Sequence, residues 1–168
     1  RGIKCESEQV MIVSGSLQSL YLIGSVILNP TDQVVLENPT FPNVHSIFKS
    51  LRAAIEGIPV DEDGLKVSKI KSRNAKLIHT TPSGHYPSSV MLSMNRRKEL
   101  LSWASAHKSY IIENEYEHEV SNYYNHLPSL FELDEENRTI FMGTFNRLLH
   151  PSVRIGYLVL PHPLIQPV

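Results

Sequence analysis

The chain has 168 residues, of which 41% are hydrophobic and 20% are charged, and its formal net charge is −1. This composition excludes a disordered tail, and the small net charge excludes a strongly basic nucleic-acid-binding domain. No apolar run approaches the roughly 18 residues that span a bilayer, and no basic and apolar leader opens the chain. Cys5 is the only cysteine, which excludes an internal disulfide and a cysteine-based zinc cluster. We expect one soluble, cytoplasmic domain.

Short β-branched runs alternate with longer amphipathic stretches along the chain. The first half predicts, in order, a strand over 9–15, a helix over 17–28, a strand over 33–38, a helix over 44–54, a strand over 54–60 and a turn over 61–64. The second half predicts a strand over 76–81, a helix over 93–107 capped by Ser93, and strands over 109–114, 138–145 and 154–161.

This alternation predicts an α/β fold in three layers, with helices on both faces of a mostly parallel sheet. Ligands in such sheets bind at the carboxyl ends of the strands. We therefore expect the chemistry in the loops that follow Val13, Asn38, Ile112 and Met142.

Two motifs in the first half have both a ligand-binding and a structural interpretation. Ser-Gly-Ser at 14–16 opens a helix, whose first N–H groups can hold an anion, although such a sequence is more often a turn with a helix cap. Phe41 lies between two prolines in PTFPN and could stack on a flat ligand, but the pattern alone favours a core position.

Two motifs in the second half carry charge. ENEYEHE at 113–119 places acids after a strand, where they could serve a site or form a solvated loop; with His126 it lacks the regular spacing of a zinc-binding helix, so we expect no metal. GTFNRLLHPSVR at 143–154 brings Thr144, Arg147 and Arg154 around a strand end. They suit a phosphate or carboxylate, or are ordinary surface residues.

Read in order, these segments resemble the large domain of fold-type I pyridoxal-phosphate aminotransferases. The variant they resemble is fused behind a winged helix-turn-helix in MocR-type transcriptional regulators of the GntR superfamily. The resemblance is carried by SGSLQSLYLI (14–23), VLENPTFPN (35–43), PVDEDGL (59–65), TTPSGHYPSSVMLSMNRRKELLSWA (80–104), IIENEYEHE (111–119) and GTFNRLLHPSVRIGYLVLP (143–161). It implies one large domain over 1–168, a DNA-binding domain upstream of Arg1 and a small subdomain downstream of Val168.

The resemblance implies roles for residues at matching positions. The backbones of Ser16 and Leu17, the hydroxyl of Thr144 and the guanidinium of Arg154 match the phosphate-binding groups. Of the residues near the cofactor ring, the stacking aromatic matches Phe41, a pocket tyrosine matches Tyr86 and the tyrosine that bonds the phenolic oxygen matches Tyr116. Around Tyr86 the family reads His-Gln-Tyr-Pro-Thr-Gly, from which Gly84, His85 and Ser89 depart.

Two further departures concern catalysis. Family members read Gly-Thr-Phe-Ser-Lys and form a Schiff base on the lysine, but Arg147 occupies that position and no lysine follows Lys108. Members also place an aspartate beside the pyridine nitrogen, where this chain has Asn114. A protonated guanidinium cannot form a Schiff base, and an amide carries no charge to keep the ring nitrogen protonated.

These observations predict the effector-sensing and dimer-forming domain of a regulator that has lost pyridoxal-phosphate catalysis. We expect a homodimer that contacts DNA only through the upstream domain, has no membrane association and binds a small anion or non-covalent cofactor. A genuine aminotransferase with a lysine from another part of the protein, and a dimerisation scaffold without a ligand, are the alternatives.

Overall fold

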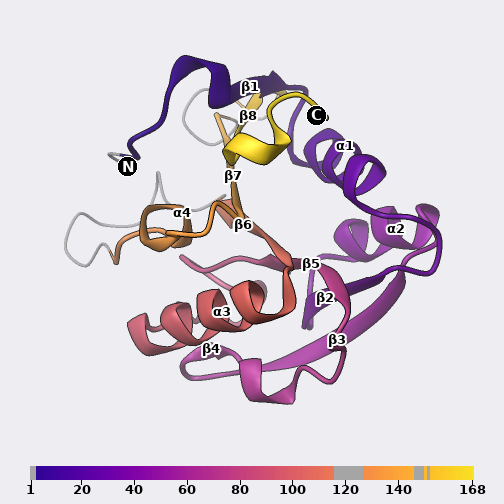
Figure 1. Cartoon of the computed structure of the whole chain (residues 1–168), viewed down its shortest axis with the longest axis vertical. Coiled ribbons are helices and arrows are strands. Elements are labelled where there is room, and N and C mark those ends of the chain that lie inside the picture. Colours follow the sequence, from indigo (N-terminus) through magenta and orange to yellow (C-terminus); the bar gives the residue numbers. More distant parts are fainter. Residues whose placement is uncertain (1–2, 116–126, 146–149, 151) are drawn as a thin grey trace.

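The computed structural model describes residues 3–115, 127–145, 150 and 152–168. In this part of the chain, eight strands form one sheet in the order β1-β8-β7-β6-β5-β2-β3-β4 (Figure 1). Neighbouring strands are parallel, except that β8 is antiparallel to both β1 and β7, and β4 is antiparallel to β3. The strands are β1 (Val10–Val13), β2 (Gln33–Asn38), β3 (Ala54–Asp61), β4 (Gly64–Leu65), β5 (Ala75–Thr80), β6 (Tyr110–Glu115), β7 (Thr139–Thr144) and β8 (Gly156–Val159).

Helices cover both faces of the sheet, as Figure 1 shows. On one face, which we call the α1 face, the apolar sides of α1 and α2 pack on alternate strand residues such as Leu36, Leu77 and Ile112. On the opposite α3 face, α3 and α4 pack on the intervening residues, among them Ile78 and Ile111. The helices are α1 (Ser16–Ile27), α2 (Pro42–Ser50), α3 (Met94–His107) and α4 (Leu130–Leu133), with 3₁₀ turns at Ser7–Gln9, Val67–Lys69 and His162–Leu164.

The three-layer α/β prediction is confirmed, and most predicted elements are present. Ser93 caps α3 by accepting a hydrogen bond from the Arg96 N–H at 3.3 Å. The helix predicted over 44–54 ends at Ser50, because Arg52 adopts a left-handed φ of 59° and the chain extends from Ala54 into β3. The two-residue β4 and the four-residue α4 are too short to give a periodic pattern.

Among the described residues, no helix is long and apolar enough to cross a membrane.

Candidate functional site

The start of α1 lies against the paired ends of β7 and β8. Gly156 is opposite Val13 on one side and Thr144 on the other, so the three residues form one row across β1, β8 and β7. A Cβ atom on Gly156 would lie 2.9 Å from the Gly143 carbonyl oxygen and 3.4 Å from the Gly15 Cα. Glycine at position 156 therefore allows the helix start to approach the strand ends closely.

This row gathers the residues predicted to bind a phosphate. Ser16 is the first residue of α1, and Gly15 before it adopts a φ of 88° and provides no side-chain cap. The first N–H groups of an α-helix have no acceptor within the helix and lie at its positive end. Thr144 ends β7, and its Oγ1 is 3.4 Å from the Ile155 carbonyl oxygen.

Arg154 precedes β8 by two residues and therefore arrives at the same edge of the sheet. It is exposed and forms no ion pair with a described acid, Glu115 included. The Leu17 side chain is exposed, so its contribution is through the backbone, as the resemblance implies. The described part of this cluster has the donors and the positive charge that an anion requires.

Asn114 lies near the end of β6 on the α1 face and is buried. Its Nδ2 is 3.2 Å from Nε2 of His79, which is fully buried on the adjacent strand β5. Desolvation lowers the pKa of His79 to about 4, so the imidazole is neutral near pH 7. The position that the resemblance matches to the family's aspartate is therefore an uncharged amide beside an uncharged ring.

Phe41 and Tyr86 stack on each other, with ring centroids 4.0 Å apart and ring planes 15° from parallel. Phe41 also packs partly buried against the core of the α1 face, so part of its core prediction is confirmed. Tyr86 is 43% exposed. Tyr116, Arg147 and the histidines and acids of the possible metal motif at 117–126 lie outside the described residues. No cluster that could hold a metal occurs among the residues that are described.

The α3 face of the same edge holds a buried polar network that the sequence did not predict. Arg97 of α3 and Glu113 of β6 are 1% and 0% exposed, and their Nη1 and Oε1 atoms are 3.5 Å apart. The guanidinium donates hydrogen bonds to three carbonyl oxygens, and Glu113 accepts hydrogen bonds from the N–H groups of α4 at 2.8 and 2.9 Å. These partners are Leu92, Pro82 and Pro128 for Arg97, and Leu130 and Phe131 for Glu113.

Two more acids of this edge are buried on the α3 face. Glu37 at the end of β2 accepts hydrogen bonds from the hydroxyls of Thr80 and Thr81, each at 2.6 Å, and Glu115 accepts one from Ser83 at 2.7 Å. Burial raises the pKa of Glu37, and burial with the nearby Glu115 charge raises the pKa of Glu113 to about 7. The solvated-loop alternative for the acidic motif is wrong for Glu113 and Glu115, because β6 continues through both.

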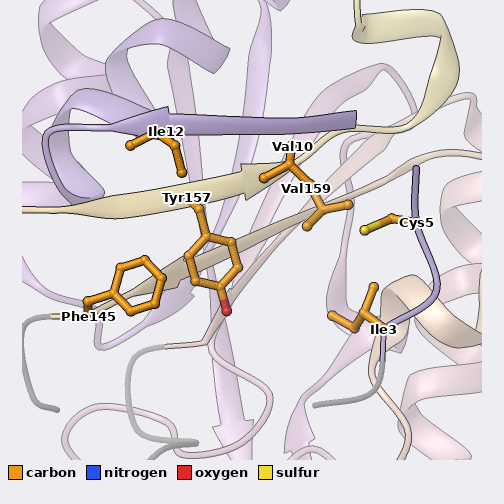
Figure 2. Close-up of a pocket in the computed structure, with 7 residues that line it drawn as sticks. All are labelled: Ile3, Cys5, Val10, Ile12, Phe145, Tyr157 and Val159. Atoms are coloured by element: carbon orange, nitrogen blue, oxygen red, sulfur yellow. The ribbon is translucent and has the colours of Figure 1, made fainter. Parts of the chain in front are cut away.

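A separate hollow of about 320 Å³ lies where β1 and β8 meet Phe145 (Figure 2). Val10, Ile12 and Tyr157 line it, and Ile3 and Cys5 lie at one end. Among the described residues, those that line this hollow carry no charged side chain, unlike the cluster around Arg154.

The fold and this edge of the sheet together define a class: an α/β domain that gathers hydrogen-bond donors and an arginine, a candidate anion cradle, at the carboxyl ends of its strands. The model of the family aminotransferase class I and II matches residues 1–167, and the chain belongs to this family. The cradle fits the phosphate end of the pyridoxal-phosphate cofactor that the family implies. The Asn114–His79 pair does not fit the protonated ring.

Named relatives fall into two groups. The chain is 39% identical over 166 residues to the helix-turn-helix-type transcriptional regulator YdeL of Bacillus subtilis, covering 99% of this chain and 36% of the relative. It is 35% identical over 168 residues to the regulator TauR of Rhodobacter capsulatus, covering 100% and 34%. A solved kynurenine aminotransferase of Pyrococcus horikoshii, in complex with PMP, is 34% identical with a TM-score of 0.87, covering 94% and 41%. The chain thus spans about a third of the length of these regulators.

Proposed function

We propose that the chain is the effector-sensing and dimerisation domain of a MocR-like transcriptional regulator. In the longer protein, residues 1–168 form the aminotransferase-like large domain, a winged helix-turn-helix precedes them and binds DNA, and a small subdomain follows. The similarity to YdeL and TauR over nearly the whole chain supports this arrangement. The same similarity supports a cytoplasmic location for the protein.

In this proposal the site binds an anion and attaches nothing covalently. The N–H groups of Ser16 and Leu17, the Thr144 hydroxyl and the Arg154 guanidinium hold the phosphate of pyridoxal phosphate or of another effector. When bound, pyridoxal phosphate supplies a ring that withdraws electrons from a substrate. Asn114 provides no charge for that chemistry.

The observation that carries the proposal is Arg147 at the position of the family's lysine. A guanidinium stays protonated and delocalised, so it is no nucleophile towards an aldehyde. The change of aspartate to Asn114 affects the other requirement, the protonated ring. Transamination with pyridoxal phosphate requires both a nucleophilic amine and a protonated cofactor ring.

The test uses the full-length protein, pyridoxal phosphate and borohydride, with peptide mass as the measurement. We expect no reduced cofactor at the carboxyl edge in the wild-type protein, and recovery of such an adduct in the variant that combines Arg147→Lys with Asn114→Asp. Adducts on Lys49 or Lys98 mark surface modification and serve as the internal control. A wild-type adduct in the site, or transamination by the wild-type protein, would contradict the proposal.

Two further measurements test the regulator itself. Sedimentation of the full-length protein should give a homodimer, and the protein should retard the DNA that flanks its own gene in a gel. A monomeric protein that does not bind this DNA would contradict the proposed regulatory function, whatever the chemistry of the site.

A further inference from the structure

The ring of Phe41 is already covered in this structure. Tyr86 stacks on it at 4.0 Å, nearly parallel, and Phe41 also packs against the apolar core of the α1 face. Stacked aromatic rings take up the same face that a flat heterocycle would use. A ring-bearing ligand can therefore stack on Phe41 in this place only after Tyr86 has moved away.

The segments that carry the two rings are joined by a buried histidine. His85 is 3% exposed, and its Nε2 lies 2.8 Å from the Pro39 carbonyl oxygen. A carbonyl oxygen only accepts hydrogen bonds, so Nε2 carries the proton, and in the neutral imidazole Nδ1 is then the acceptor for the Ser88 hydroxyl at 2.7 Å. His85 directly precedes Tyr86, and its side chain thus links the Tyr86 loop to the turn before Phe41.

The buried side chain of Glu37 provides a second link between the same two segments. Glu37 is the penultimate residue of β2, and its carboxylate accepts hydrogen bonds from the hydroxyls of Thr80 and Thr81, where β5 leads into the loop that carries Tyr86. Two buried polar connections therefore fix the loops on either side of the aromatic pair. Buried hydrogen bonds therefore hold the two stacked rings in place, even though the Tyr86 side chain is exposed.

We propose that Tyr86 is a specificity-determining residue of the anion site: its ring competes with a flat ring for the face of Phe41, so the site favours anions without one. The inference rests on the proposed function, since it concerns the same site, and it names small non-aromatic anions as the favoured ligand class. It also opposes the cofactor-binding role that the resemblance implies for Tyr86.

The test compares two probes, inorganic phosphate and pyridoxine 5′-phosphate, by calorimetry on the full-length protein. Pyridoxine 5′-phosphate has the flat ring but no aldehyde, so it cannot react with lysines. An aromatic stack is worth a factor of about two to ten in affinity. We expect Tyr86→Ala to raise the affinity for pyridoxine 5′-phosphate by this factor and to leave the affinity for inorganic phosphate unchanged.

Matched variants separate the ring from other effects. Tyr86→Phe keeps the stack and should behave like the wild-type protein, and Tyr21→Ala removes an exposed tyrosine of α1 as a control. Tyr86→Leu provides a second variant without a flat ring if the alanine variant fails to fold. Adding Phe41→Ala to Tyr86→Ala should abolish the gain, because the platform is then lost.

Each result has one meaning. An unchanged or weaker affinity for pyridoxine 5′-phosphate in both Tyr86→Ala and Tyr86→Leu would overturn the inference. Failure of inorganic phosphate to bind the wild-type protein would refute the anion site of the proposed function, while a gain for the ring-bearing probe in Tyr86→Ala would still support the role of Tyr86.

Discussion

At the carboxyl ends of the strands, the two faces of the sheet carry different kinds of polar group. On the α3 face, Glu37, Arg97 and Glu113 are buried, and protein groups bond to them from several segments. On the α1 face, the row at Gly156 has a helix start without a side-chain cap, small residues and the exposed Arg154. The buried polar pair on this face, Asn114 and His79, is uncharged. The buried charges of the α3 face thus stabilise the scaffold, and the row at Gly156 is the proposed ligand site.

The largest expected effect comes from replacing Arg97, which tests the structural role of the α3 face. We expect Arg97→Met to lower the free energy of unfolding by about 3–5 kcal/mol, because three carbonyl oxygens would lose a hydrogen-bond donor and Glu113 would lose its ion-pair partner. Urea denaturation measures the change. Arg73→Met, at an exposed arginine, should change the free energy by less than about 0.5 kcal/mol. Equal effects of the two variants would contradict a structural role for the α3 face.

A second expectation concerns pH and the α1 face. The pKa of His79 falls from 6.5 in the unfolded chain to about 4 in the folded protein, so its contribution is complete above pH 6.5 and is lost as the pH falls towards 4. The loss approaches about 3 kcal/mol. Urea denaturation of the wild-type protein and of His79→Gln across this range should show a smaller loss in the variant.

The contribution of Glu113 to stability has the opposite pH dependence, so it serves as the internal comparison. Its pKa is raised from 4.5 to about 7, so its contribution is present below pH 4.5 and is lost as the pH rises through 7. If His79→Gln and the wild-type protein lose stability in parallel on acidification, the imidazole is not buried as a neutral group.

The smallest expected effect concerns anion binding at the proposed ligand site on the α1 face. Arg154→Ala should weaken the binding of inorganic phosphate about tenfold, because a charge-assisted hydrogen bond is lost at an exposed position. Calorimetry at two salt concentrations measures it, and wild-type binding should weaken as salt rises. The control Lys49→Ala changes an exposed lysine at the end of α2 and should bind phosphate normally.

Periodicity in the sequence was enough to predict most of the sheet and its helices, because apolar residues alternate faithfully between the two cores. It could not predict that β8 runs antiparallel, since strand direction leaves no mark on a short apolar run. It also gave no reason to bury Glu113 and Glu115. Their burial follows from the length of β6, from the partners that α3 and α4 supply to Glu113, and from Ser83, which donates to Glu115.

For the site, the order of motifs was more informative than any residue alone. Ser16, Thr144 and Arg154 are each ordinary in isolation, and the register of β1, β8 and β7 brings their segments together. His79 was missed, although one signal was present: it shares a face with Leu77, and Asn114 shares that face with Ile112 on the neighbouring strand. The stacking of Tyr86 on Phe41 depends on loop geometry that no spacing encodes.

The reversed direction of β8 also has a consequence for how such a domain can change in evolution. Because β8 begins at the edge where β7 ends, Thr144 and Arg154 are only ten positions apart in the sequence, with Arg147 between them. Point mutations within one short segment can therefore replace the family's lysine and leave both proposed anchors of the anion unchanged. A gene could exchange catalysis for ligand sensing in a few codons, without rebuilding the domain around them.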